Sequence, residues 1–212
     1  MTRVRTARSE STREAILDAA ERLYAENGVV SVSNRQVGDA AGQANSAAVG
    51  YHFGTKEDLV RAIVVRRSAG VEQFRASHVA ALGDRPDLRG WVSALVRPST
   101  EYFADVGHST WYARFASQVM TDPTLRTILV EESLSSPGLR ETVDGVNSCL
   151  PPMPVDVRVA RGGMARTLLV HVMAEREAEI AASDGDRAAQ WRASGTDLVD
   201  AIVGIWQATV TR

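Results

Sequence analysis

Three helix-start signatures lie close together near the N-terminus, and they constrain the fold more than any other feature of the chain. Each is a Ser or Thr followed three residues later by Glu, Gln or Asp, the spacing of a capping box; the pairs are Ser11–Glu14, Ser33–Gln36 and Thr55–Asp58. Gly28 and Gly42 follow the first two predicted helices, where glycine is typical of a helix end. We therefore expect helices over residues 12–27, 33–41 and 46–52, and a long helix from 55 to about 79.

The rest of the chain also follows a helical period, with Pro and Gly between amphipathic stretches. We expect helices over residues 88–106, 109–120, 123–133, 138–148, 155–183 and 187–210. No run alternates as a strand does. The fold class expected is all-α with about nine or ten helices: a three-helix N-terminal domain over 1–55, with a basic tail, and a larger helical domain over 56–212.

Composition narrows the class of protein. The chain has 212 residues, is 44% hydrophobic and carries a net charge of −2, which is ordinary for a globular protein and gives no overall basicity. No apolar run is long enough for a membrane span, so no membrane partner is expected. The first residues lack the apolar stretch of a secretory signal, and Cys149 is the single cysteine. These features predict a cytoplasmic protein in which Cys149 fills a core or an interface.

The second and third predicted helices have the pattern of a helix-turn-helix. Val37, Ala40, Ala41 and Val49 are spaced to pack the two helices on each other and on the first helix. That packing leaves an outward face where a major groove would lie, formed by Ser46, Ala47, Gly50 and Tyr51. Asn34 and Arg35 come at the start of the preceding helix, where backbone N–H groups attract phosphate.

The stretch Val49–Leu59, VGYHFGTKEDL, resembles the signature of TetR-type (tetracycline-repressor-like) transcriptional regulators. Members of that family carry an aromatic-His-Phe, small residues, Lys-Glu and Leu at this spacing. Upstream, Ile16–Leu23, Gly28 and Ala40–Gly42 fit the same family. The resemblance covers residues 9–64. It implies a DNA-binding repressor that a small-molecule effector releases from a palindromic operator.

The resemblance also implies roles for individual residues. Asn34 and Arg35 would contact phosphate or a base, Tyr51 and His52 would reach the DNA backbone, and Lys56 would hold a phosphate. Many family members have tyrosine where this chain has Gly50. Base recognition would therefore depend on Asn45, Ser46 and a thymine-methyl contact from Ala47. The expected DNA-binding residues are Asn34, Arg35, Asn45, Ser46, Ala47, Gly50, Tyr51, His52 and Lys56.

An aromatic-rich stretch suggests where an effector pocket lies. Aromatic side chains cluster around residues 91–115, and polar side chains near them would set specificity. The alternative is that these aromatic side chains are ordinary core. The pocket residues expected are Trp91, Tyr102, His108, Trp111, Arg114, Phe115, Gln118 and His171. The identity of the small molecule does not follow from them.

The last two predicted helices carry wide apolar stripes and are the predicted homodimer interface. The residues expected there are Leu168, Leu169, Val172, Leu198, Ile202, Ile205 and Trp206. Family resemblance implies a four-helix bundle between two subunits. Two-fold symmetry would then require a palindromic double-stranded DNA operator.

Other classes of function have weaker support in the sequence. Common nucleophile, phosphate-loop and Cys-x-x-Cys motifs are missing, and the four histidines are scattered. We therefore expect no enzyme, no cofactor and no metal site. The alternatives are a helical ligand-binding or scaffold protein without DNA binding, an activator or nucleoid-type DNA binder, and an enzyme that uses His171 with carboxylates.

Overall fold

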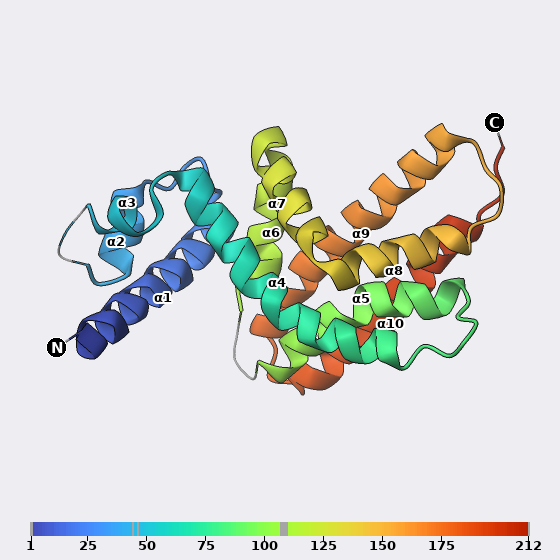
Figure 1. Ribbon diagram of the computed structural model, residues 1–212, viewed down its shortest axis with the longest axis horizontal. Coiled ribbons are helices and arrows are strands. Elements are labelled where there is room, and N and C mark those ends of the chain that lie inside the picture. Colours follow the sequence, from blue (N-terminus) through green and yellow to red (C-terminus); the bar gives the residue numbers. More distant parts are fainter. Residues whose placement is uncertain (1, 44, 46, 107–109, 212) are drawn as a thin grey trace.

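The computed structural model of the protein describes residues 2–43, 45, 47–106 and 110–211, with side chains from residue 9 on. This part of the chain forms ten α-helices and no β-strand, as predicted (Figure 1). The helices are α1 (Thr2–Asn27), α2 (Asn34–Ala40), α3 (Ala48–Phe53), α4 (Lys56–Ala80), α5 (Leu88–Asp105), α6 (Tyr112–Thr121), α7 (Pro123–Ser135), α8 (Pro137–Ser148), α9 (Val155–Ala181) and α10 (Arg187–Gln207).

Two of the three predicted capping boxes are present. Ser33 caps α2 and Thr55 caps α4, each with the reciprocal side-chain bond from its partner three residues on. At α4, hydrogen bonds from Thr55 lower the pKa of the Asp58 carboxyl. The predicted box at Ser11 is wrong, because α1 begins at Thr2 and runs through that position. No glycine or proline interrupts residues 2–27, so nothing stops the helix from extending toward the N-terminus.

The first three helices and the start of α4 enclose a small apolar core. Gly54, at the end of α3, has a φ of +78°, a backbone conformation that favours glycine, and it turns the chain directly into α4. The side chains in this core are fully or almost fully buried; they include Ile16, Leu17, Ala20, Val37, Val49, Phe53 and Leu59. The helix-turn-helix predicted from the spacing of Val37, Ala41 and Val49 is therefore confirmed, whereas Ala40, which was expected to pack with them, is exposed.

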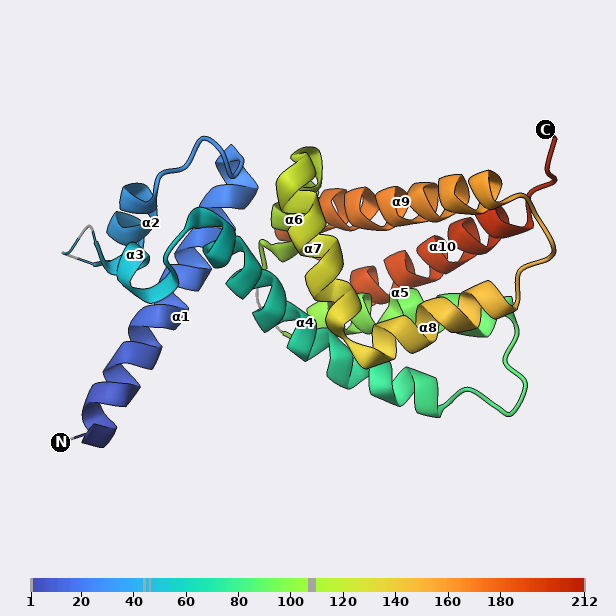
Figure 2. The ribbon, with the colours of Figure 1, turned by 45° about the horizontal axis from the view of Figure 1, so that its top comes forward.

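The second part of the molecule is built around α5 and α10, which pack along each other, with α9 beside α10 (Figure 2). Its core is contributed mostly by side chains of these helices: Val92, Val96, Phe103, Met173, Trp191, Leu198 and Ile202. The N-terminus and α1–α3 lie at one end of the molecule, and the C-terminus lies at the other (Figures 1 and 2).

Helices α6 and α7 connect these two parts. Phe115 and Val119 of α6 and Leu125 of α7 lie in the same core cluster as the N-terminal helices. Phe115 stacks on Tyr24 of α1, with ring centroids 6.3 Å apart. The predicted division at residue 55 therefore falls inside a continuous apolar core, and that division stays a prediction.

A buried ionic cluster strengthens the same junction. Glu21 of α1 is 1% exposed and accepts hydrogen bonds from Arg66 and Arg67 of α4, the shortest at 2.7 Å. Arg67 also donates to the hydroxyl of Tyr102 on α5 at 3.0 Å. Burial opposes the charged form of Arg67, but Glu21 outweighs it and raises the pKa of the guanidinium. Helix α4 is thereby tied to both parts of the molecule.

Candidate DNA-binding surface and ligand cavity

The turn between α2 and α3 sets the outward face of α3. The side-chain oxygen of Asn45 accepts a hydrogen bond from the Ala47 N–H at 2.9 Å, and helix α3 begins one residue later. Val49 and Phe53 face the core, whereas Ala47, Gly50 and Tyr51 are exposed, Tyr51 by 85%. Apart from its chain neighbours and the backbone of its own helix, no atom of the described residues lies within 4 Å of the point where a Cβ on Gly50 would be. This face is open to a large partner; the predicted contact Ser46 lies outside the described residues.

The start of α2 presents Arg35 rather than Asn34. The side chain of Arg35 is 80% exposed, and its Nε lies 3.8 Å from the carboxylate of Asp39. An ion pair this exposed contributes little and leaves the guanidinium available to another anion. Asn34 is half-buried, and its Oδ1 has no hydrogen-bond partner among the described residues. Of the two, Arg35 is positioned to meet a phosphate.

Lys56 lies at the start of α4, as predicted, but its ammonium already has partners. Nζ donates to the carbonyl oxygens of Val29 at 3.0 Å and of Val30 at 3.4 Å, in the loop between α1 and α2. An ammonium has three donors, so one is left for a phosphate. Lys56 therefore also holds the loop that precedes α2.

Arg13 helps to position α3, a role that the sequence motifs did not indicate. Its guanidinium lies 4.4 Å from the centre of the Phe53 ring, and it donates to the carbonyl of His52 at 3.5 Å. The exposed side chain of Arg13 thus holds the end of α3 against α1. His52 is half-buried, with its ring edge-on to Tyr51. Since 39 residues separate Arg13 from His52, no local spacing could reveal the contact.

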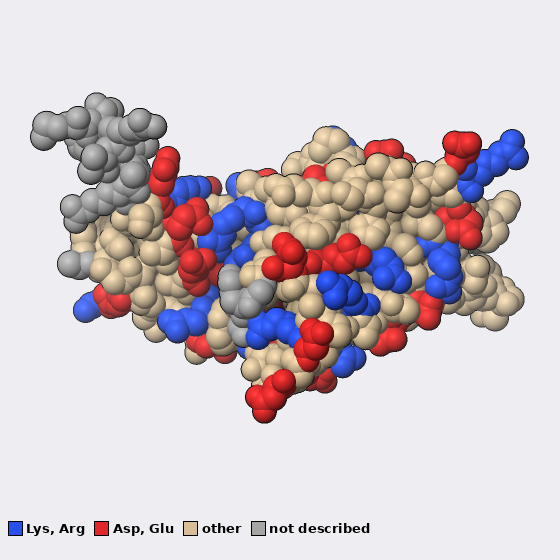
Figure 3. All heavy atoms as spheres, turned by 90° about the horizontal axis from the view of Figure 1, so that it is seen from below, with Lys and Arg blue, Asp and Glu red and all other residues tan. Residues whose placement is uncertain are grey.

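Charge is mixed on the side of the molecule that is seen from below in Figure 3. Figure 3 shows one face of the molecule, on which acidic and basic side chains alternate without a broad patch of one sign. This distribution accords with the net charge of −2. Attraction for DNA therefore depends on where the basic side chains lie and not on the net charge of the chain.

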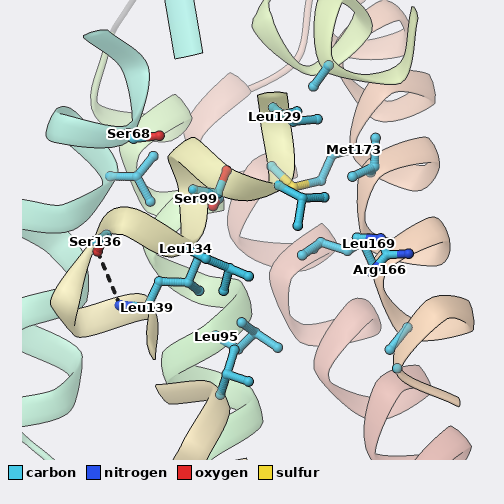
Figure 4. Close-up of a pocket in the computed structure, with 18 of the residues that line it drawn as sticks. Ser68, Leu95, Ser99, Leu129, Leu134, Ser136, Leu139, Arg166, Leu169 and Met173 are labelled. Carbon is cyan, nitrogen blue, oxygen red and sulfur yellow. Dashed lines mark hydrogen bonds between the residues drawn. The ribbon is translucent and has the colours of Figure 1, made fainter. Parts of the chain in front are cut away.

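A cavity of about 570 Å³ lies between α4, α5, α6, α7, α8 and α9, with one residue of α10, Trp206, in its wall (Figure 4). That volume is typical of a pocket for a small organic molecule. Its interior is mainly apolar and includes Leu95, Leu129, Leu139, Leu169 and Met173. Ser68, Ser99 and Ser136 place hydroxyl groups along the wall that faces α9 (Figure 4).

Four charged residues line the cavity, and two of them neutralise each other. Glu72 accepts a hydrogen bond from the Ser136 hydroxyl and lies 3.4 Å from Arg75 Nε. Arg75 is buried and donates to the carbonyl of Ala94 at 2.7 Å; burial lowers the pKa of its guanidinium, against the effect of Glu72. Arg158 and Arg166 come from α9 and are exposed.

The cavity is lined by residues other than those predicted. His108 lies outside the described residues, and none of the other seven lines the cavity. Four of these side chains contact other parts of the protein: Phe115 lies in the N-terminal core, Tyr102 accepts a hydrogen bond from Arg67, Trp91 packs on Gly145, and Gln118 lies beside Gly28. Trp111 and Arg114 form a cation–π pair with each other. His171 is exposed. Of the aromatic cluster, Phe103 and Tyr112 do line the cavity, whereas Trp91, Tyr102, Trp111 and Phe115 pack in or against the cores.

Arg114 illustrates why sequence could not place the pocket. Its Nε donates to Glu177 of α9 at 3.1 Å, and Glu177 is 3% exposed. The same carboxylate accepts the backbone N–H groups of Ala113 and Arg114 and the hydroxyl of Thr110. This contact joins the start of α6 to α9. Because the Nε–H of Arg114 is used in it, that group is not available to a ligand.

The predicted dimer interface is partly wrong. Leu198, Ile202 and Trp206 are buried inside their own chain, at 2%, 0% and 6% exposed, because α5 and α9 cover that side of α10. Leu169 and Trp206 line the cavity, while Leu168, Val172 and Ile205 are half-buried. The outer face of α9 and α10 carries other residues, which include Met164, Thr167, His171, Ala201 and Gly204. A wide apolar stripe on a helix can pack in the chain's own core as well as in an interface, so the stripe alone does not mark the dimer contact.

Two further properties bear on the class of protein. Within the described ranges, no group of three or more His, Cys, Asp or Glu side chains is placed to hold a metal ion. In the same part of the chain, no helix combines the length and apolarity that crossing a membrane requires.

Comparison with known proteins identifies the N-terminal region. Residues 16–63 match the family described as "Bacterial regulatory proteins, tetR family". Over these residues the chain is similar to the TetR family. The matched residues include α2, α3 and the start of α4, the elements that form the surface described above.

A curated relative supports the same assignment over a longer stretch. The chain is 32% identical over 120 residues to the HTH-type transcriptional regulator BetI of Rhizobium meliloti (strain 1021). That match covers 56% of this chain and 57% of the relative, so the chain spans little more than half the length of the protein it matches.

Several solved structures share the fold over almost the whole chain. GusR of Salmonella enterica has a TM-score of 0.51 and 20% identity, and it covers 93% of this chain and 96% of its own. PfmR of Thermus thermophilus has a TM-score of 0.55, 16% identity and the same coverage. A TetR-family regulator from Marinobacter aquaeolei VT8 has a TM-score of 0.56 and 18% identity, with 92% and 97% covered. At these identities the likeness shows the fold alone.

Proposed function

We propose that this protein is a sequence-specific DNA-binding transcriptional regulator, a repressor that a small molecule releases from a palindromic operator. The observation that carries the proposal is the exposed face of α3 in the region similar to the TetR family, where Ala47, Gly50 and Tyr51 point away from the core. Short side chains there allow close approach to base edges in a major groove. The function is that of a cytoplasmic binding protein rather than an enzyme.

The DNA contacts divide into two kinds. Ala47, with Asn45 and Ser46, would meet base edges at the start of the recognition helix, and Gly50 would let the helix backbone come close. Arg35, Tyr51, His52 and Lys56 would contact the phosphate backbone, which positions the protein without reading sequence. Because few long side chains face the bases, DNA shape would supply much of the discrimination.

A homodimer would form on the outer face of α9 and α10. Met164 is 59% exposed, and a shallow hollow beside it is lined by Gly163, Thr167, Leu168 and Ile205. The neighbouring face of α10 carries Ala201 and Gly204, whose small size allows two helices to approach closely. A two-fold axis through this face would place two recognition helices on one operator, about 34 Å apart.

Ligand release would act through the helices that form the cavity. Residues of α4 and α6 line the cavity, and both helices also contact α1: α4 through Arg66 and Arg67, and α6 through Phe115. A ligand that fits only one arrangement of these helices would favour one separation of the two recognition helices. The N-terminal domain, proposed as residues 1–55, would then lose its fit to the operator.

Footprinting on DNA from upstream of the protein's own coding region tests the proposal. We expect a protected, palindromic site at nanomolar to micromolar protein. Arg35→Gln should weaken binding about tenfold and reduce the dependence of log K on log salt by about one unit, since one phosphate contact is lost.

Arg85→Gln removes an equal charge from an exposed position in the loop between α4 and α5, at the far end of the molecule from α3 (Figures 1 and 2). It should change neither affinity nor salt dependence. Equal effects of the two substitutions would mean that α2 does not meet the DNA backbone, and the absence of any protected site would refute the proposed function on that DNA.

A further inference from the structure

The charges around the cavity indicate what kind of molecule it takes. We propose that the ligand is an amphipathic anion whose apolar body fills the cavity and whose charged head is held by Arg158 and Arg166 of α9. This inference rests on the proposed function in taking the cavity as the effector site. It goes beyond that function by naming the chemical class of the effector.

The interior of the cavity suits an apolar body. Leu95, Leu129, Leu134 and Leu139 reach it from α5, α7 and α8, and Met173 reaches it from α9 (Figure 4). Removing apolar surface from water is the main favourable term available to a ligand in such a site. A volume of about 570 Å³ is enough for a medium-length hydrocarbon chain or a small ring system.

The only carboxylate among the described residues of the wall is already satisfied. Glu72 binds the Ser136 hydroxyl and pairs with Arg75, and a Cβ on Gly138 would overlap its other oxygen. Arg75 in turn donates to the carbonyls of Ala94 and Leu95. The two opposite charges cancel within the protein. This pair therefore neither attracts a cationic ligand nor offers a free charge to an anionic one.

Arg158 and Arg166 differ from that pair in having no acidic partner in the part of the chain that the structure describes. Both line the cavity from α9, both are exposed, and neither forms an ion pair with any described residue. They lie eight residues apart on one helix, about 12 Å along its axis. Two guanidinium groups on flexible stems can reach a head group between them, and the planar fork of arginine matches a carboxylate.

The net charge of the wall therefore comes from α9. With Glu72 and Arg75 cancelling, the two free arginines leave it at about +2, next to a surface of leucine and methionine. A neutral apolar molecule would leave both arginines unused, and a cationic one would be repelled by them. Only an amphipathic anion satisfies the apolar interior and the basic edge together.

Binding measured by calorimetry, without DNA, tests the inference with three ten-carbon probes below their micelle concentrations: decanoate, 1-decanol and decyltrimethylammonium. We expect decanoate to bind at least tenfold more tightly than decanol and the cation to bind most weakly. In the double variant Arg158→Gln/Arg166→Gln, decanoate should lose about tenfold in affinity, while decanol should be unchanged. Arg192→Gln, an exposed arginine of α10 that does not line the cavity, should leave all three affinities unchanged.

A variant that fills the cavity locates the bound molecule. Ser99→Phe places a ring where the serine hydroxyl lies in Figure 4, and it should abolish decanoate binding while thermal melting shows a folded protein. Decanoate binding that survives Ser99→Phe in a folded protein would refute the site. Tight binding of decanol or of the cation, no binding of any probe, or an unchanged preference for decanoate in the double variant would refute the proposed class.

Operator release is measured separately, so that the two proposals fail independently. If decanoate binds through Arg158 and Arg166 but leaves the complex with operator DNA intact, the ligand class stands and the proposed release mechanism fails. If other molecules release the operator while decanoate does not bind, the release mechanism stands and the anionic class fails.

Discussion

The two ends of this molecule use their helices in opposite ways. At the N-terminal end, α2 and α3 are only seven and six residues long, their apolar side chains fill a tight core, and the side chains proposed to act point outward. At the other end, long helices surround a cavity, and the side chains proposed to bind a ligand line the interior or the edge of that cavity. A DNA-reading surface needs a rigid scaffold behind it, whereas a ligand site needs space.

The junction decides whether these two ends behave as one unit. Tyr24 and Glu21 of α1 contact Phe115 of α6 and Arg67 of α4, so the scaffold of one end is continuous with a wall of the other. These contacts reach α1, and α1 in turn packs against α2, which contacts α3.

The largest effect is expected at the buried carboxylate of the junction. Glu21→Ala leaves Arg66 and Arg67 without their buried partner, and we expect a loss of about 3–5 kcal/mol in the free energy of unfolding. Glu14→Ala, which removes a 57% exposed partner of the same Arg66, should cost under about 1 kcal/mol. Urea unfolding followed by circular dichroism provides both values. A small loss in Glu21→Ala would show that the two ends fold independently of this cluster.

The second effect concerns assembly. Ala201→Arg places a charge on the outer face of α10, where the side chain is exposed in the single chain, so the fold should persist. If this face forms the dimer, the dissociation constant should rise about a hundredfold, because an unpaired charge would be desolvated in the interface. Analytical ultracentrifugation measures it, with Ala76→Arg on the exposed side of α4 as the matched control. Dimers of unchanged stability in both variants would place the interface elsewhere.

A smaller effect separates the true capping box from the false one. Thr55→Ala removes the side chain that accepts the Asp58 N–H at 3.1 Å, and it should lower the free energy of unfolding by about 1 kcal/mol. Ser11→Ala lies within α1 and should cost nothing, since alanine favours helix interiors. Thermal melting of the two variants compares them directly. Equal losses would mean that α1 does not continue past Ser11 in solution.

The smallest effect is expected inside the N-terminal core. Burial raises the pKa of the Tyr24 hydroxyl, which has no hydrogen-bond partner among the described residues. Tyr24→Phe should therefore leave the free energy of unfolding unchanged or raise it slightly. Tyr102→Phe, which removes the acceptor of Arg67, should instead cost about 1 kcal/mol. Equal destabilisation of the two in urea would show that the Tyr24 hydroxyl has a partner after all.

The success of sequence interpretation also differs between the two ends. The starts of α2 and α4 follow from the capping boxes at Ser33 and Thr55, because a cap depends on residues that are neighbours in the chain. The exposure of Tyr51 and burial of Phe53 follow from helical spacing in the same way. The partners of Lys56 and Arg13 lie more than 25 residues away in sequence, and no local pattern reveals them.

At the cavity, the order and length of the helices were predictable, but the lining was not. Phe115 and Leu169 have similar apolar character, yet one fills the N-terminal core and the other lines the cavity. Which of the two faces the space depends on how α6 and α9 pack against α1 and α10. Likewise, Trp206 belongs to an apolar stripe of α10 that α5 and α9 cover within the same chain, so the stripe alone could not locate the dimer interface.

Selection of binding sites from random double-stranded DNA, carried out with the wild type and with Ala47→Arg, tests the central claim most directly. Ala47 is exposed at the start of α3, so the substitution should leave the fold unchanged. The wild type should enrich a palindromic sequence, and the variant should enrich a different base at one position in each half-site, with a preference for guanine, whose O6 and N7 suit a guanidinium. No enriched sequence for the wild type, or the same sequence for both proteins, would contradict the account.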